Sequence, residues 1–205
     1  RDVSAYESDA QGAVAQANEM LPSRYDLRDE GVVTPVKSQS PWGTCWSFGA
    51  AAACETSIMS ELGWSVNANQ TVDLSELHAA WFAYTPLPDS AGSQAGEGRH
   101  STSTDPNAFL NEGGFPYTVT SVLSSGIGPV SEAYAPYRNK EGIIAKDSQG
   151  NPVCYAPTGD WSVDESLRFL QAVELEESCV LPSPAGKDAN GSYYYNQAGT
   201  DAIKK

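Results

Sequence analysis

The chain has 205 residues, of which 26 are acidic and 12 basic, so its net charge is −14 at pH 7. A strongly negative charge disfavours nucleic acid and anionic membrane surfaces as partners. The five tryptophans and ten tyrosines supply material for a folded core and argue against a disordered chain. No apolar run approaches the roughly 18 residues that a membrane-spanning helix needs, and no signal peptide is visible.

The chain opens with residues 1–20, which are polar and rich in alanine, and we interpret them as an N-terminal arm or a propeptide remnant. The first pattern that indicates chemistry follows at residues 39–48. Here Cys45 stands where a helix is about to begin. A thiol in the first turn of a helix lies beside unpaired backbone N–H groups and the positive end of the helix dipole, which favour the nucleophilic thiolate.

Gln39 lies far enough upstream of Cys45 for its side-chain amide to fold back to the same place. An amide there would meet the oxyanion that forms during acyl transfer. The alternative interpretation is an inert core cysteine beside a turn glutamine.

A central helix is predicted from Cys45 to about Leu62, because Cys54, Ile58 and Leu62 recur at four-residue steps and Gly63 offers a stop. Cys54 lies on this helix amid the alanines 50–53, and we interpret its position as part of the core.

The remaining segments predict loops, short helices and strands. Residues 85–112 are rich in Pro, Gly, Ser and Asp, and we interpret them as a long surface insertion. Beyond it, the sequence predicts a helix near residues 118–123, a turn at 148–152, a helix-like stretch at 164–171, a turn at 188–192, a strand at 193–195 and the opening of an amphipathic helix at 200–205.

Several motifs of this chain occur together in one known family. Residues 42–46 read Trp-Gly-Thr-Cys-Trp, and further motifs lie at residues 21–28, 33–39, 74–76, 113–117 and 128–137. Together they resemble the papain-like cysteine proteases, of the bacterial type, whose nucleophile lies in the signature C-G-[SA]-C-[WY]. The resemblance covers most of residues 21–137 and fades after that.

Two departures from the family pattern lie next to the nucleophile. Trp42 stands where the family has a cysteine that forms a disulfide, and Thr44 replaces a smaller residue. The first change removes a crosslink that braces the loop before the helix. We expect Trp42 to brace this loop by packing instead.

The resemblance implies an α+β fold. Its mainly helical first domain has the central helix after Cys45, and the start of a β-rich second domain would be completed by another chain. In these terms, residues 1–20 are the arm, residues 21–140 the helical domain with its insertion at about 85–112, and residues 141–205 the crossover and the incomplete start of the second domain.

The resemblance also assigns roles to residues. Cys45 attacks the scissile carbonyl and forms a thioester, while its backbone N–H and the side chain of Gln39 hold the oxyanion. The substrate-binding residues that the resemblance implies are Gly43, Trp46, Gly113, Gly114, Phe115 and Pro116. Glycines let an extended peptide approach closely, although those before Phe115 are equally consistent with an ordinary turn.

The histidine and asparagine that complete the family's site follow the cysteine by about 130–150 residues. This chain has no histidine in that region; its two histidines are His78, on a predicted helix, and His100, in a predicted loop. Core packing for His78 and solvent exposure for His100 explain these residues more simply than a role as general base. We therefore expect a two-chain enzyme, in which proteolytic maturation near Lys205 separates this chain from a second chain of the same precursor that carries the His and Asn.

The expected function is that of a cysteine endopeptidase for peptide or protein substrates, secreted or at the cell surface, without cofactor or metal. Two alternatives remain open: a noncatalytic peptide-binding module of protease descent, and a thiol acyltransferase or transpeptidase. Cys154 and Cys179 could form a disulfide in an oxidising compartment, which their spacing alone does not decide, and no cysteine pair has zinc-ligand spacing.

Overall fold

The computed structural model describes residues 21–87, 98–101, 103–138, 142–146 and 148–204. They form two compact units: Leu27–Glu176, and the described residues before Leu27 together with those after Glu176. The predicted arm, the middle of the predicted insertion and Lys205 lie outside the described residues. The predicted domain boundaries at residues 20 and 140 stay predictions.

The central helix α2 (Cys45–Glu61) begins at the predicted nucleophile. Just beyond the end of the helix, Gly63 adopts a left-handed conformation with a φ of 62°. The N–H groups of Gly63 and Trp64 donate to the carbonyls of Ser60 and Met59 at 3.2 and 2.8 Å, which satisfies two of the last carbonyls of the helix. The predicted helix and its glycine stop are confirmed.

The buried face of α2 is offset from the apolar positions that indicate the helix in the sequence. Its buried residues include a run at four-residue steps, formed by Ser47, Ala51, Glu55 and Met59. The predicted stripe lies beside that run: Cys54 and Ile58 are half-buried, and Leu62 is 54% exposed. Cys54 contacts the core only from its edge. Cys54 therefore lies at the edge of the predicted core and not within it, because an acidic residue occupies the centre of the buried face and apolar periodicity passes over a glutamate.

Glu55 is that acidic residue, and its buried carboxylate joins two distant segments to α2. Thr34 Oγ1 donates to its Oε2 at 2.5 Å, and the backbone N–H of Leu74 donates to its Oε1 at 2.8 Å. Lys37 Nζ lies 2.9 Å from the same Oε1. A buried carboxylate is tolerated when hydrogen bonds and a cation compensate for its lost hydration.

Lys37 carries this compensation for more than one acid. Its Nζ lies 2.8 Å from Asp73 Oδ1 and 2.6 Å from Glu76 Oε1. Burial by itself would lower the pKa of Lys37, but hydrogen bonds to Asp73, Glu76 and Glu55 raise it overall, so the side chain remains a cation. Burial raises the pKa of Glu76, while the ammonium of Lys37 opposes that shift.

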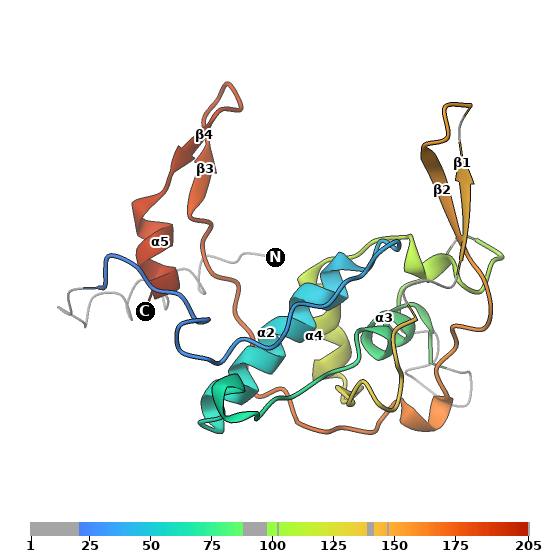
Figure 1. Cartoon of the computed structure of the whole chain (residues 1–205), viewed down its shortest axis with the longest axis horizontal. Helices are drawn as coiled ribbons and strands as arrows, with labels where there is room; N and C mark the ends of the chain where they lie inside the picture. The colour runs from blue at the N-terminus through green and yellow to red at the C-terminus, as the bar shows by residue number, and fades with distance from the viewer. Residues whose placement is uncertain (1–20, 88–97, 102, 139–141, 147, 205) are drawn as a thin grey trace. The chain divides into compact units, whose positions relative to one another are not determined.

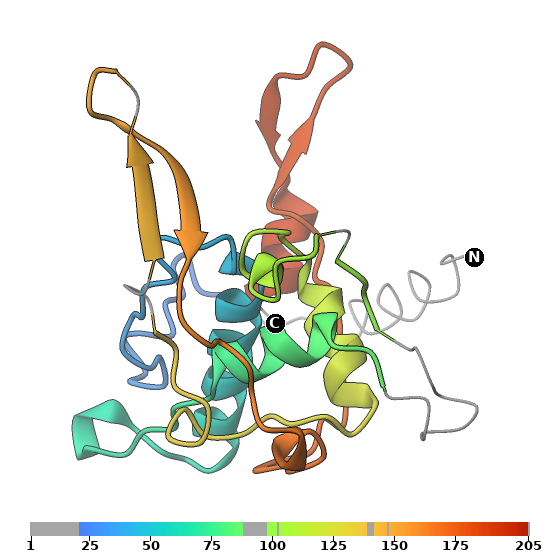
Figure 2. The same ribbon diagram turned by 90° about the vertical axis from the view of Figure 1, so that its right-hand side faces the viewer.

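Two further helices pack against α2 and complete the helical core (Figures 1 and 2). Helix α3 (Glu76–Tyr84) is capped by Ser75, whose Oγ accepts the N–H of His78 at 3.0 Å. Helix α4 (Pro116–Ser124) has a proline at its first position, which needs no N–H partner there. The helix predicted at residues 118–123 is confirmed, and it is longer at both ends.

The end of the predicted surface insertion belongs to the core. Residues 108–110 form a short 3-10 turn (η3, Ala108–Leu110), in which Phe109 and Leu110 are buried. The ring of Phe109 packs edge-on against Trp81 of α3, with centroids 5.3 Å apart. Composition alone pointed to a surface loop because these two residues lie at the end of a polar, glycine-rich segment.

The strands form two small hairpins. Strand β1 (Gly142–Lys146) pairs with β2 (Pro152–Pro157), and β3 (Ala185–Lys187) pairs with β4 (Tyr193–Tyr195), both antiparallel. The turns predicted at residues 148–152 and 188–192 connect them, and the strand predicted at residues 193–195 is confirmed. The predicted α+β class, with a mainly helical first part and the beginnings of a β-rich part, is therefore confirmed.

Two further predictions concern helices near the end of the chain. The helix-like stretch at residues 164–171 is one 3-10 turn (η4, Glu165–Leu167), capped by Asp164. The amphipathic helix is α5 (Gln197–Lys204), and Lys204 Nζ donates to the carbonyl of Pro22 at 2.9 Å. Within the described ranges, no helix combines the length and apolar character needed to cross a bilayer.

The charge cluster leads to a test of stability. Replacing Lys37 with methionine removes the ammonium that Glu55 and Glu76 share and leaves their carboxylates buried without a cation. We expect the free energy of unfolding to fall by about 3 kcal/mol, measured by urea denaturation. Asp73→Asn is the matched control: its side chain is 55% exposed, so it should cost less than about 1 kcal/mol. Equal losses in the two variants would contradict this account of the cluster.

Candidate active site

Cys45 is the first residue of α2, and its side chain is exposed. The buried Thr44 precedes the helix as its N-cap, and its carbonyl accepts the N–H groups of Ser47 and Phe48 at 3.0 and 3.3 Å. Among the described residues, the backbone N–H of Cys45 has no acceptor. An exposed sulfur therefore lies beside a backbone donor that is available to an incoming anion.

Gln39 lies in the turn that leads to α2. Its Nε2 donates to the carbonyl of Trp42 at 2.7 Å, and the N–H of Trp42 donates back to the carbonyl of Gln39 at 3.0 Å. These two bonds hold the Gln39 amide against the loop that ends at Cys45. A primary amide carries two N–H donors, so one donor remains for a ligand in addition to the bond to Trp42.

Trp42 fills the place of the missing cysteine by packing, as the sequence leads us to expect. Its side chain is 2% exposed, and its ring meets Trp161 edge-on with centroids 5.8 Å apart. A tryptophan buries far more apolar surface than a cysteine, so the loop before the helix is anchored to the core without a crosslink.

The predicted glycines lie against this loop. The N–H of Gly43 donates to the carbonyl of Leu110 at 2.8 Å, which brings residues 110–114 beside the nucleophile loop. Gly114 packs on the indole of Trp46, where a β-carbon would lie 2.5 Å from the ring. This close approach requires glycine at position 114.

The next residues form an exposed aromatic edge. Tyr84 Oη donates to the carbonyl of Gly113 at 2.7 Å and holds the glycine pair in place. Phe115 is 54% exposed and stacks parallel on Tyr117, with centroids 5.2 Å apart, just as α4 begins at Pro116. All six predicted substrate-binding residues thus lie on two adjoining segments, although their role stays a prediction.

Tyr137 also belongs to this site, although no role is predicted for it from the sequence. Its Oη donates to the carbonyl of Gln39 at 3.1 Å and lies 2.6 Å from Thr44 Oγ1. Its ring packs edge-on against Phe48 and Trp161, with centroids 4.8 and 5.6 Å away. Burial raises the pKa of Tyr137, so the hydroxyl keeps its proton. One side chain therefore fixes the spacing between Gln39 and the start of α2.

Glu132 positions Tyr137 in turn. Its Oε1 accepts the backbone N–H of Tyr137 at 2.6 Å. Burial raises the pKa of Glu132 to about 7, and the negative charges of Glu76 and Asp73 act in the same direction. The bond from Tyr137 and the cation of Lys37 only partly offset these effects.

Neither histidine of the chain is placed to act as a general base. His78 is 1% exposed and donates from Nε2 to the carbonyl of Leu167 at 2.9 Å. Burial lowers its pKa, and its ring packs against Phe82 within the core. His100 is exposed in a loop. Both therefore have the surroundings of ordinary packed or solvated side chains.

The remaining cysteines are separate from this site. Cys54 is half-buried on α2, and burial raises its pKa, with the charge of Glu55 adding to the effect. Cys179 is exposed and has no disulfide partner among the side chains that the structure describes. The side chain of Cys154 lies outside the described part, so the open question of a disulfide with Cys179 stays open.

An exposed cysteine at the start of the central helix, a glutamine amide held on the preceding loop and an adjoining glycine pair define a papain-like arrangement. Residues 21–79 match the family model of the papain family cysteine proteases. The resemblance inferred from the sequence is thereby confirmed for this segment, which contains both Gln39 and Cys45.

Relatives with curated names extend the likeness beyond that segment. Cysteine proteinase 3 of Solanum lycopersicum is 30% identical over 140 residues, which are 68% of this chain and 32% of the relative. Zingipain-1 of Zingiber officinale is 28% identical over 170 residues, which are 83% of this chain and 64% of the relative. The chain thus spans less than two thirds of the length of either protein.

Solved structures of this kind are also similar. The bromelain protease of Ananas comosus in complex with the E64 inhibitor is 24% identical, with a TM-score of 0.38 over 66% of this chain and 49% of that one. Digestive procathepsin L2 of Tenebrio molitor is 21% identical, with a TM-score of 0.43 over 68% of this chain and 36% of that one.

The raised pKa of Glu132 predicts a pH effect on stability. Between about pH 4.5 and 7 the folded state keeps a proton that the unfolded state has lost, so raising the pH through this window destabilises the fold. Glu132→Gln keeps an acceptor for the Tyr137 N–H but cannot ionise. When the pH rises from 5 to 8, the free energy of unfolding of this variant should increase relative to that of wild type by on the order of 1 kcal/mol. This figure is reduced for the solvent screening of a half-buried group.

The measurement for Glu132 is the urea unfolding curve of both proteins at pH 5 and pH 8. The other titrating groups, Glu76 included, are common to both proteins, so the difference isolates this carboxyl group. Parallel pH profiles for the two proteins would show that Glu132 titrates normally.

Proposed function

We propose that this chain provides the nucleophile and the oxyanion-binding groups of a cysteine endopeptidase. The observation that carries the proposal is the exposed Cys45 at the start of α2, with its own backbone N–H unpaired among the described residues and the Gln39 amide held on the adjoining loop. The family match over residues 21–79 supports the same class of chemistry.

The proposed reaction follows from these groups. The Cys45 thiolate attacks the carbonyl carbon of the scissile amide, and the resulting oxyanion accepts hydrogen bonds from the Cys45 N–H and the Gln39 side chain. The carbon–nitrogen bond then breaks, the amine leaves with a proton from a general acid, and a thioester remains on Cys45. Water hydrolyses the thioester, which releases the acid and restores the thiol.

The substrate is proposed to lie along the edge formed by Gly43, Trp46 and residues 113–116. Gly113 and Gly114 offer backbone groups to an extended peptide, and Trp46 forms the wall beneath them. Phe115 and Pro116 add apolar surface next to this backbone edge.

In this proposal the general acid is the histidine of a second chain, because neither histidine of this chain is placed beside Cys45. His78 is held in the core by Leu167, and His100 lies in an exposed loop. We further propose that maturation near Lys205 yields a two-chain enzyme, whose second chain brings the histidine and asparagine. The secreted or cell-surface location belongs to the same proposal.

The deciding experiment is covalent labelling of the native, unfractionated protein with an epoxysuccinyl inhibitor, followed by intact mass and peptide mapping. We expect one adduct on Cys45, its absence in Cys45→Ala, and its retention in Cys54→Ala and Cys179→Ala. The intact mass should also reveal a partner chain that contains histidine. A labelled protein that transfers acyl groups to amines but does not hydrolyse peptides would be a transpeptidase, and peptide binding without labelling would identify a noncatalytic module.

Two rates distinguish the proposed roles of Gln39 and Tyr137 from general effects on folding: the rate at which Cys45 is alkylated and the rate at which peptides are hydrolysed. Alkylation of Cys45 by iodoacetamide forms no oxyanion, whereas peptide hydrolysis does. Gln39→Ala should therefore lower kcat by about a hundredfold, in the range known for the loss of one oxyanion donor, and leave the alkylation rate nearly unchanged.

Tyr137→Phe removes only the hydroxyl that spaces Gln39 from Thr44, so kcat should fall by about tenfold with KM little altered.

Thr71→Val, a substitution of an exposed residue outside the site, serves as the control and should leave both rates unchanged. A parallel loss of alkylation and hydrolysis in Tyr137→Phe would mean that this variant disturbs the thiol itself, and the spacing role would be wrong.

A further inference from the structure

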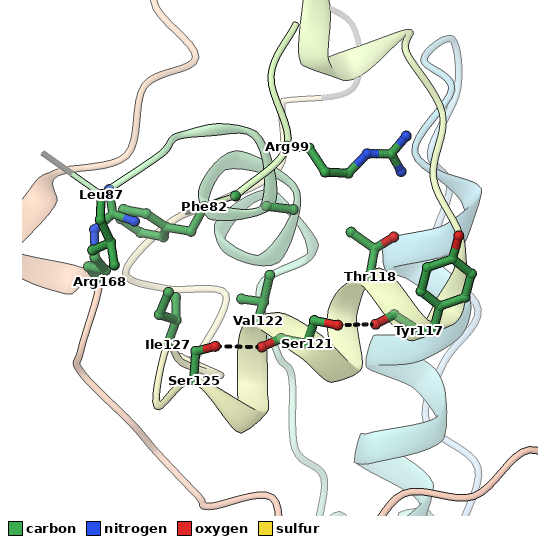
Figure 3. A pocket seen from close by; sticks show the side chains of 12 residues that line it. Phe82, Leu87, Arg99, Tyr117, Thr118, Ser121, Val122, Ser125, Ile127 and Arg168 are labelled. Carbon is green, nitrogen blue, oxygen red and sulfur yellow. Dashed lines mark hydrogen bonds between the residues drawn. The ribbon is translucent and has the colours of Figure 1, made fainter. Parts of the chain in front are cut away.

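A pocket of about 390 Å³ lies between α3 and α4, on the part of the chain that follows the proposed substrate edge (Figure 3). This volume is within the range of sites that bind small ligands or side chains. Cys45 does not line it. The pocket is formed by residues of α3, of α4 and of the neighbouring loops: Phe82, Ala83, Leu87, Gly98, Arg99, Tyr117, Thr118, Ser121, Val122, Ser125, Ile127 and Arg168.

The pocket owes its shape to short side chains on α4. Ser121 Oγ donates to the carbonyl of Tyr117 at 2.9 Å, and Ser125 Oγ donates to the carbonyl of Ser121 at 2.8 Å (Figure 3). Both hydroxyls therefore bond back to their own helix and leave an open groove with an apolar floor. The helix backbone rises about 12 Å from Tyr117 to Ser125, a distance that about three or four extended residues span.

In the described part of the chain, two charged residues line the pocket, and both are arginines: Arg99 and Arg168. Arg168 is buried, pairs with Glu165 and donates to the carbonyl of Thr85. Arg99 is exposed, and its guanidinium lies over the ring of Tyr84 at 5.1 Å. Among the residues that the structure describes, no carboxylate lies within ion-pair distance of Arg99. Arg99 therefore offers a cation beside an apolar groove, on a chain whose net charge is −14.

The pocket is continuous with the proposed substrate edge. Tyr117 lines the pocket, and its other neighbour is the stacked ring of Phe115. Tyr84, which carries Arg99 on its ring, holds the carbonyl of Gly113. A polypeptide that leaves the glycine pair over Phe115 therefore meets Tyr117 and Arg99 next.

We propose that this pocket is an accessory binding site for a polypeptide segment in which a carboxylate side chain adjoins apolar residues. The carboxylate pairs with Arg99 and the apolar side chains lie in the groove along α4. The choice of a polypeptide over a free amphiphilic carboxylate rests on the proposed function. The site would make the enzyme favour substrates with an acidic residue beyond the one that contacts Phe115.

The probe is a fluorescein-labelled hexapeptide with one glutamate between two leucines, compared with a twin that carries glutamine instead. Binding to the full protein is measured by fluorescence anisotropy in a Cys45→Ala background, which prevents turnover. We expect the glutamate peptide to bind about fivefold more tightly, the size of a favourable ion pair near a protein surface, with the preference shrinking as salt is added.

Three variants test the assignment. Arg99→Gln should remove the preference for glutamate, and Ser121→Leu should weaken both peptides because the larger side chain fills the groove. Arg24→Gln, an exposed arginine outside the lining, should retain the wild-type preference. A preference that survives in Arg99→Gln, or undiminished binding to Ser121→Leu, would overturn the proposal. Displacement of the peptide by sodium decanoate, at a concentration below the peptide Kd, would assign the pocket to free amphiphiles and overturn it too.

The outcome is separable from that of the proposed function. Hydrolysis of the glutamine twin by wild-type protein, with equal binding of the two peptides, would sustain the peptidase and end the accessory site. Selective binding, together with a failure of the native, unfractionated protein to hydrolyse either peptide, would sustain the site and end the peptidase.

Discussion

A carboxylate buried in the middle of the central helix holds the parts of the site in place. Glu55 accepts hydrogen bonds from Thr34 and from the backbone of Leu74, and it shares Lys37 with the start of α3. Lys37 lies two residues before Gln39, so the segment that carries the glutamine amide is tied to the same helix that carries Cys45. The geometry between nucleophile and oxyanion donor thus depends on a charge cluster well inside the protein. Such a cluster is stable only when all its members are present, because removing one partner leaves a buried charge with neither a counter-charge nor water around it.

Local chemistry explains which elements could be predicted from the sequence. The ends of α2 and the turn before β4 depend on residues next to them, such as Gly63 and Asp188, whose carboxylate accepts the N–H groups of Asn190 and Ser192. The buried face of α2 and the burial of Phe109 depend on partners far along the chain. Glu55 is buried only because Lys37 and Thr34 reach it, and no periodicity records that fact.

The same division applies to the candidate site. Cys45 and Gln39 could be found because they lie within one short motif. Tyr137 could not, because its hydrogen bond to Gln39 joins residues 98 positions apart. The one signal available was its position at the end of a segment that resembles the family. The pocket on α4 left even less trace, since it arises where Ser121 and Ser125 are small rather than where any residue is chemically distinctive.

The aromatic residues beneath the nucleophile loop have an optical consequence. Trp42 and Trp161 meet nearly perpendicularly, at 84°, and Tyr137 lies against the second indole. Rings fixed in such an asymmetric environment give near-ultraviolet circular dichroism, which vanishes when specific packing is lost. Part of the near-ultraviolet signal therefore reports on the packing beneath the loop that carries Cys45, and a loss of this packing can be followed in unlabelled protein while the far-ultraviolet signal of the helices persists.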